Sequence, residues 1–251
     1  MPFFSLLTIW GTWKFWQERK FIWLPIIGIS LAFALQSHYL GLLLVPLVAV
    51  FWLSTFLKIR KTEGLRPFVR NTIYGVILFL VLMSPIVIFD ARHGYRNFAA
   101  MRTFFSERQT TVSARPWNAI PKIPKLADDI TTRLLAGRNE TAGKITFLAA
   151  VALSVFLFAK RKTLNNKTRD AFVLLGLWLA FALVGLGLYK QEIYDHYYGF
   201  FFAAPFLFLG GVVEEVFRLD QKRFFQVPIF LGLVMLVLAN HAATPIRYPP
   251  N

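Results

Sequence analysis

The chain has 251 residues, of which 56% are hydrophobic and only 16% are charged, and its mean hydropathy is +0.52. A soluble domain of this length needs more charge on its surface, so these values exclude an ordinary soluble protein and indicate a polytopic membrane protein. The net charge of +15 does not point to nucleic acid, because the basic residues lie between apolar segments, where they meet lipid headgroups and set the topology.

The first predicted element is the apolar stretch MPFFSLLTIWGTW, residues 1–13. It has no basic leader and no small-residue cleavage site, so we do not interpret it as a signal peptide. It is also shorter than the about 20 residues that cross a hydrocarbon core. We therefore interpret it as the end of a helix, and we expect that the chain lacks the N-terminal spans of a longer fold.

Seven apolar segments follow, each long enough or nearly long enough to be a membrane helix. They cover residues 21–35, 39–57, 72–89, 145–159, 171–188, 199–217 and 224–240. The predicted fold class is all-α, a polytopic bundle of about seven or eight transmembrane segments. We expect residues 1–251 to form a single membrane-embedded domain.

Four short basic connectors orient the bundle. They cover residues 14–20, 58–70, 160–169 and 218–223, and they hold 16 of the 28 Lys and Arg residues. Short basic connectors stay in the cytoplasm. This places the tip QSHY of a short helical hairpin, residues 21–57, on the outer side. All four histidines, which were not used to set the orientation, then fall on the outer side as well.

The long outer loop, residues 90–144, contains two amphipathic patterns. The stretch NFAAMRTFFSER (97–108) has apolar residues near helical spacing. The stretch KLADDITTRLLAG (125–137) places Leu126, Ile130 and Leu134 on one face, opposite two aspartates and an arginine, and ends at a glycine. We predict that both are helices lying on the membrane surface.

Polar groups gather in three outer stretches: ALQSHYLG (34–41), SPIVIFDARHGYRNF (84–98) and YKQEIYDHYYG (189–199). Each has a structural alternative, namely helix capping at the first, snorkelling arginines at the second and an aromatic belt at the third. The functional alternative is an anion site, because arginine and histidine side chains can donate hydrogen bonds to a phosphate. Asp195 beside His196 offers a proton acceptor and an orienting partner.

No metal-binding motif such as HExxH is present, and the chain has no cysteine to supply a thiolate. We therefore predict neither a metal site nor a cofactor, although a divalent metal is left possible.

With ALQSHYLGLLLVP, SPIVIFDARHGYRN and YDHYYGFFFAAPFLFL in this order, the chain resembles the C-type, membrane-embedded glycosyltransferases. The similarity is to the branch of protein-mannosyltransferase-like and lipid-A-arabinosyltransferase-like enzymes. The resemblance implies a substrate-binding set made of His38, Tyr39, Arg92, His93, Arg96, Lys190, His196 and Tyr197. In that family the catalytic acidic residue lies in the first outer loop, upstream of this chain, which leaves Asp90 and Asp195 as weak candidates for the base.

The resemblance further implies transfer of a hexose or pentose from a polyprenyl-phosphate donor to a lipid, glycan or protein acceptor. The expected location is a bacterial plasma membrane, with the site facing outside and membrane lipids around it. A fragment without the acidic loop could be inactive alone. The alternative is a non-enzymatic membrane protein, either a lipid or oligosaccharide translocator or a scaffold subunit. A translocator would need polar residues through the depth of the bilayer, whereas this sequence keeps them at one interface.

Overall fold

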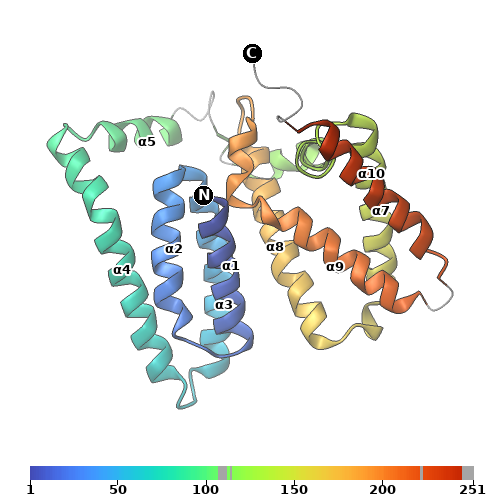
Figure 1. The fold of residues 1–251 in the computed structure, drawn as a ribbon. Helices are drawn as coiled ribbons and strands as arrows, with labels where there is room; N and C mark the ends of the chain where they lie inside the picture. Colours follow the sequence, from blue (N-terminus) through green and yellow to red (C-terminus); the bar gives the residue numbers. More distant parts are fainter. Residues whose placement is uncertain (107–111, 114, 221–222, 245–251) are drawn as a thin grey trace. The chain divides into compact units, whose positions relative to one another are not determined.

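Most of the described chain is helical, which confirms the all-α prediction (Figure 1). The computed structural model describes residues 1–106, 112–113, 115–220 and 223–244. Within these ranges there is no β-strand, only an isolated bridge between Val112 and Tyr189. The chain divides into two units. The first unit comprises residues 1–119 and 180–201, and the second unit comprises residues 120–179 and 202–251.

The first unit begins with three apolar helices that pack together. They are α1 (Pro2–Gln17), α2 (Trp23–Ser37) and α3 (Leu44–Ile59). The helical hairpin predicted over residues 21–57 is present, with arms of 15 and 16 residues and a 3-10 turn, η1 (Tyr39–Leu43), at its tip. Small hydroxyl side chains allow α1 to approach α2 closely. The Thr8 and Ser30 hydroxyls are fully buried and lie 2.8 Å apart, so each satisfies the other.

α4 (Leu65–Arg92) begins earlier than the predicted segment 72–89, because the basic residues before that segment are already helical. A proline in its first turn is compatible with this start, since the first N–H groups of a helix have no partner within it. α4 packs on α2 through Gly28 and Gly75. A Cβ added to Gly75 would lie 2.6 Å from the Leu24 carbonyl oxygen, so the two backbones meet where only glycine fits.

A proline in the interior of α4, Pro85, has no N–H to bond the carbonyl of Val81. The hydroxyl of Ser84 donates to that carbonyl at 2.7 Å. The side-chain amide of Gln36, at the end of α2, donates to the neighbouring carbonyl of Leu82 at 2.8 Å. In a bilayer no water is available for such groups, and side chains of this kind take its place. Gln36 thus ties the hairpin tip to α4.

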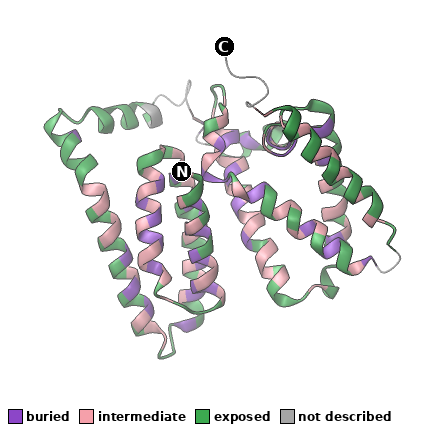
Figure 2. Cartoon of the chain, in the orientation of Figure 1, coloured by how far each residue is buried: buried purple, intermediate pink, exposed green. Residues whose placement is uncertain are grey.

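Among the residues that the structure describes, four helical segments are long and apolar enough to cross a membrane. They are Tyr39–Ile59, Leu65–Arg92, Glu140–Ala159 and Asn166–Leu188, with lengths of 20 to 28 residues. α4 illustrates the environment they need, since only 6% of its apolar window is buried and most of its residues are exposed or intermediate (Figure 2). Such a surface is stable in lipid and not in water. Two further apolar helices, Trp23–Ser37 and Gln226–Ala242, are shorter.

The second unit is built from the remaining long helices. They are α6 (Ile123–Ile130), α7 (Glu140–Ala159), α8 (Asn166–Leu188), whose C-terminal end belongs to the first unit, α9 (Ala203–Leu219) and α10 (Gln226–Ala242). Three shorter 3-10 turns are also present. η4 (Arg161–Thr163) belongs to the second unit, η5 (Asp195–Phe200) belongs to the first unit, and η2 (Pro116–Lys122) has residues in both. Leu157 of α7 packs with Val212 and Val216 of α9 to form a small buried core.

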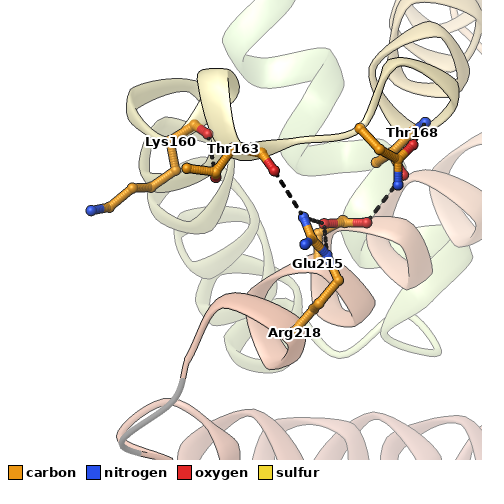
Figure 3. Close-up of polar contacts among 6 residues, drawn as sticks. Lys160, Thr163, Thr168, Glu215 and Arg218 are labelled. Atoms are coloured by element: carbon orange, nitrogen blue, oxygen red, sulfur yellow. Dashed lines mark hydrogen bonds and ion pairs between the residues drawn. The ribbon is translucent and has the colours of Figure 1, made fainter.

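A buried carboxylate network joins the connector between α7 and α8, and the start of α8, to the end of α9 (Figure 3). Glu215 is 6% exposed and accepts from the Arg218 guanidinium at 2.7 Å and from the Thr168 hydroxyl at 3.1 Å. Arg218 also reaches the carbonyl of Thr163 at 3.5 Å. The exposed neighbour Glu214 lies outside this network.

The predicted loop helices are present with different bounds. α5 (Arg96–Ser106) matches the first, and residues 107–108 of the prediction lie outside the described residues. In the second, the predicted α-helical face of Leu126, Ile130 and Leu134 is interrupted after Ile130. After Ile130 the helix continues as a π-turn, in which Leu135 is buried at 7% exposure while Leu134 is only half-buried. The wider π-turn adds one residue per turn and rotates the next buried position by one.

Candidate functional site

The hairpin tip holds His38 in a defined orientation. His38 follows the last residue of α2 in an extended conformation, and its N–H donates to the Ala34 carbonyl at 3.1 Å. Its ring Nδ1 accepts from the Leu40 N–H at 3.2 Å. In the neutral imidazole the proton must then be on Nε2, which leaves an N–H donor for an outside group.

The segment after α8 brings a second set of aromatic and titratable side chains to the same place. It is anchored by three buried rings at its C-terminal end, Tyr198, Phe200 and Phe201, each at most 1% exposed. Its N-terminal end is anchored by the bridge between Tyr189 and Val112. Between these anchors the short η5 turn carries Asp195, His196 and Tyr197.

The two stretches meet around His38. Its ring centroid lies 4.4 Å from that of Tyr39, 5.2 Å from that of Tyr197 and 5.7 Å from that of His196. Tyr197 contacts Tyr189 at 5.7 Å, and Tyr194 stacks on His196 at 5.9 Å. We call the set His38, Tyr39, Tyr189, Tyr194, His196 and Tyr197 the histidine–tyrosine cluster. All of its members belong to the first unit.

The surroundings of the cluster favour the neutral forms of His38 and Tyr197. Burial lowers the pKa of His38, and the nearby His196 lowers it further. The pKa of Tyr197 is raised, first by its hydrogen bond to Tyr189 and then by burial. At neutral pH His38 therefore presents an imidazole N–H and Tyr197 a protonated phenol, which are hydrogen-bond donors without a full charge.

The second predicted stretch, at the end of α4, shows a different arrangement. Asp90 is buried, and both of its oxygens accept backbone N–H groups of α5, from Asn97 at 2.7 Å and from Phe98 at 3.0 Å. This is the geometry of a helix N-cap, reached from the preceding helix. Asp90 therefore has a structural task that leaves its carboxylate little capacity to act as a base.

The basic residues beside Asp90 lie on the surface. Arg92, His93 and Arg96 are all exposed. The His93 ring stacks on Phe89 at 4.0 Å, and its Nδ1 donates to the Phe89 carbonyl at 2.7 Å. Within the described part of the chain, the contacts of Arg92, His93 and Arg96 do not reach the histidine–tyrosine cluster. Figure 1 shows the end of α4 apart from the end of α2 within the first unit.

The remaining predicted residues lie beside the cluster. Lys190 follows Tyr189 and is exposed, whereas Asp195 is half-buried at the start of η5. Two members of the cluster, Tyr189 and Tyr194, were not predicted as site residues. Their signal was present in YKQEIYDHYYG, where tyrosines flank the histidine on both sides, but an aromatic belt has the same composition.

No group of three or more His, Asp or Glu residues close enough to hold a metal ion occurs in the part of the chain that the structure describes. Comparison with models of protein families, with curated proteins and with solved structures finds no match for this chain.

Proposed function

We propose that the protein is a membrane glycosyltransferase that moves a sugar from a polyprenyl-phosphate donor to a hydroxyl of a lipid, glycan or protein acceptor. The observation that carries the proposal is the approach of His38 to His196 and Tyr197, from two stretches far apart in the sequence. Polar groups in a membrane protein are costly and mark functional sites when they converge.

The chemistry of the transfer requires donors of this kind. The acceptor oxygen forms a bond to the anomeric carbon while the bond from that carbon to the phosphate oxygen breaks. Polyprenyl phosphate then leaves with the bonding pair. Hydrogen-bond donors aimed at the developing phosphate charge lower the barrier. We assign this task to the Nε2–H of His38 and to the cluster's tyrosines, with Lys190 supplying a positive charge nearby.

The proton of the acceptor hydroxyl must pass to a base. Of the two candidate carboxylates, Asp195 is favoured in this chain, because it begins the turn that carries His196. Asp90 is disfavoured because two backbone N–H groups occupy its oxygens. The Asp195→Asn variant should therefore bind the donor normally and transfer sugar slowly, whereas Asp90→Asn should retain transfer.

We also propose that the bundle has seven or eight membrane segments and that the cluster faces outside a bacterial plasma membrane. In the first unit, the connectors from α1 to α2 and from α3 to α4 lie at one end, and the hairpin tip lies at the other (Figure 1). With basic connectors on the cytoplasmic side, the cluster is extracytoplasmic. Reporter fusions after Lys61 and Tyr189 test this orientation and should report opposite sides.

The deciding experiment uses the full chain in proteoliposomes that contain a polyprenyl-phosphate-linked sugar with a fluorescent label. A transferase releases free polyprenyl phosphate, and the rate should fall at least tenfold in His38→Ala and His196→Ala, the size expected when a hydrogen bond to a charged group is lost. His241→Ala, an exposed histidine at the end of α10, is the matched control. A translocator would instead move the lipid between leaflets, seen by dithionite quenching, with no polyprenyl phosphate released.

A further inference from the structure

A groove with a volume of about 560 Å³ lies between the start of α2 and the first half of α4, in the first unit. Its lining residues are Ile22, Pro25, Arg70, Asn71, Tyr74, Ile77 and Leu78. The α4 members fall at positions i, i+1, i+4, i+7 and i+8, which form one face of a helix. This volume is within the range of sites that hold a small ligand or a part of a lipid.

The groove is polar at one end and apolar along the rest of its length. Arg70 is exposed, and no carboxylate in the described ranges pairs with it. The Asn71 amide is held in place by donating to the Pro67 carbonyl at 2.7 Å. Further along α4 the groove is lined by Tyr74, one turn after Arg70, and by Ile77, two turns after Arg70. A ligand that fits must carry an anionic head and an apolar body.

The polar end of the groove lies in a strongly basic environment. The connectors 14–20 and 58–70 are close together, because Phe21 contacts Phe68 with ring centroids 5.2 Å apart. Together they carry eight basic residues and two acidic ones. One of the two, Glu18, is bonded to Lys14 and Lys20, whose hydrogen bonds lower its pKa to about 2. Anions are therefore attracted to this end.

The apolar end of the groove is in the part of α4 that lipid must cover. Tyr74 and Ile77 are about half exposed, and α4 as a whole buries almost none of its apolar window. The groove runs beside the glycine contact between Gly28 and Gly75, which brings the two helices together and leaves side chains to form the walls. An acyl chain in this position would be continuous with the surrounding bilayer.

From these features we propose that the groove binds one anionic glycerophospholipid from the leaflet on the side of the basic connectors. Its phosphate pairs with Arg70 as a charge-assisted hydrogen bond, and one acyl chain lies along Tyr74, Ile77 and Leu78. The site is at the opposite end of α2 from His38 and does not depend on the proposed transferase activity. Its role is to fix α4 against α2.

Native mass spectrometry of the full chain tests the site by counting retained lipids. The protein is titrated with phosphatidylglycerol and, in parallel, with zwitterionic phosphatidylcholine. Arg70→Gln should weaken retention of the first phosphatidylglycerol about tenfold, equivalent to about 1.4 kcal/mol, and leave phosphatidylcholine unchanged. Arg66→Gln is the matched control, because it removes the same charge from an exposed residue of α4 that does not line the groove.

A second variant tests the acyl part separately. Ile77→Trp fills the groove without changing charge and should also weaken retention of phosphatidylglycerol. Equal retention in Arg70→Gln and Arg66→Gln would overturn the proposal, because the attraction would then come from the connector as a whole. Retention unchanged by Ile77→Trp, or displacement of the lipid by inorganic phosphate alone, would overturn it too, since the groove would then bind only a headgroup.

Discussion

The imidazole rings of His38 and His196 lie 5.7 Å apart, although one belongs to the tip of a short hairpin and the other to the segment that follows α8. Neither ring sits next to an arginine in the described contacts, so their neighbours are tyrosines and each other. Two imidazoles this close cannot both carry a proton at little cost, because like charges repel. The pair therefore has a preferred state in which at least His38 is neutral.

This preference predicts a pH-dependent stability. The pKa of His38 is lowered in the folded protein, so below its ordinary value of 6.5 the unfolded chain binds a proton that the folded chain does not. The stabilisation is complete above pH 6.5 and is lost as the pH falls toward the lowered pKa. Thermal unfolding in nanodiscs between pH 7.5 and 5.5 should show a falling Tm in the wild type and a shallower fall in His38→Gln. His241→Gln should behave as the wild type does, and an equally shallow profile there would rule out His38 as the source.

The cap formed by Asp90 should be detectable in the turn between α4 and α5. Asp90→Ala removes the acceptor of two N–H groups and should destabilise the start of α5 by about 0.5–2 kcal/mol. Hydrogen exchange at the amides of Asn97 and Phe98 should accelerate accordingly. Asp90→Asn, which keeps one acceptor oxygen, should show a smaller effect. Unchanged exchange in Asp90→Ala would mean that other contacts hold the turn.

The network of Glu215 predicts a difference between two adjacent glutamates. Glu215→Ala leaves Arg218 and Thr168 without their acceptor and should lower the free energy of unfolding by about 1–3 kcal/mol, less than for a fully buried pair because the Arg218 side chain is 45% exposed. Glu214→Ala, at an exposed position of the same helix, should change it by less than about 0.5 kcal/mol. Chemical unfolding of both variants in detergent measures the difference, and equal values would show that the network contributes nothing.

Replacing glycine by alanine should have different effects on stability at Gly75, in the contact between α2 and α4, and at Gly176, where nothing is packed against the glycine. Gly75→Ala forces a methyl group against the Leu24 carbonyl and should destabilise the protein by about 1–3 kcal/mol. Gly176→Ala in α8 meets no atom within 4 Å and should be neutral or stabilise by up to about 1 kcal/mol, because alanine is the better helix former. Thermal unfolding of the two variants is the measurement. A loss of stability in Gly176→Ala of the same size would point to a general effect of helix glycines.

Much of the helical framework could be predicted from hydrophobic segments alone, since a membrane segment must satisfy its own backbone and has little choice but to be helical. The hairpin over 21–57 and the placement of His38 at its tip follow from this. The start of α4 could not be placed, because basic residues at a helix end resemble a connector. The capping role of Asp90 could not be predicted either, because the sequence around a carboxylate at the end of a span does not distinguish a cap of the next helix from a proton acceptor.

The basic connectors predict that His38 and His196 lie on the same side of the membrane, but a common side does not determine the distance between them. The distance depends on how the segment after α8 is anchored, through Tyr198 and its buried neighbours. Arg92 and His93 are exposed at the end of α4, where His93 contacts Phe89, and their place in the predicted substrate-binding set stays a prediction.

The π-turn after Ile130 has a consequence for insertions and deletions. One residue corresponds to about 100° of rotation in an α-helix, so a single extra residue turns everything after it by that amount. In this chain the extra residue points Leu135 inward, and the carbonyl of Leu135 accepts from Asn240 at 2.6 Å. Removing one residue from 131–135 would restore an unbroken α-helix and place Leu126, Ile130 and the next leucine in phase, yet it would withdraw the carbonyl that Asn240 holds. The length of segment 131–135 is thus tied to Asn240, which is more than one hundred residues away in the sequence. Homologous chains that have a different number of residues in this segment should therefore also have a different residue at position 240.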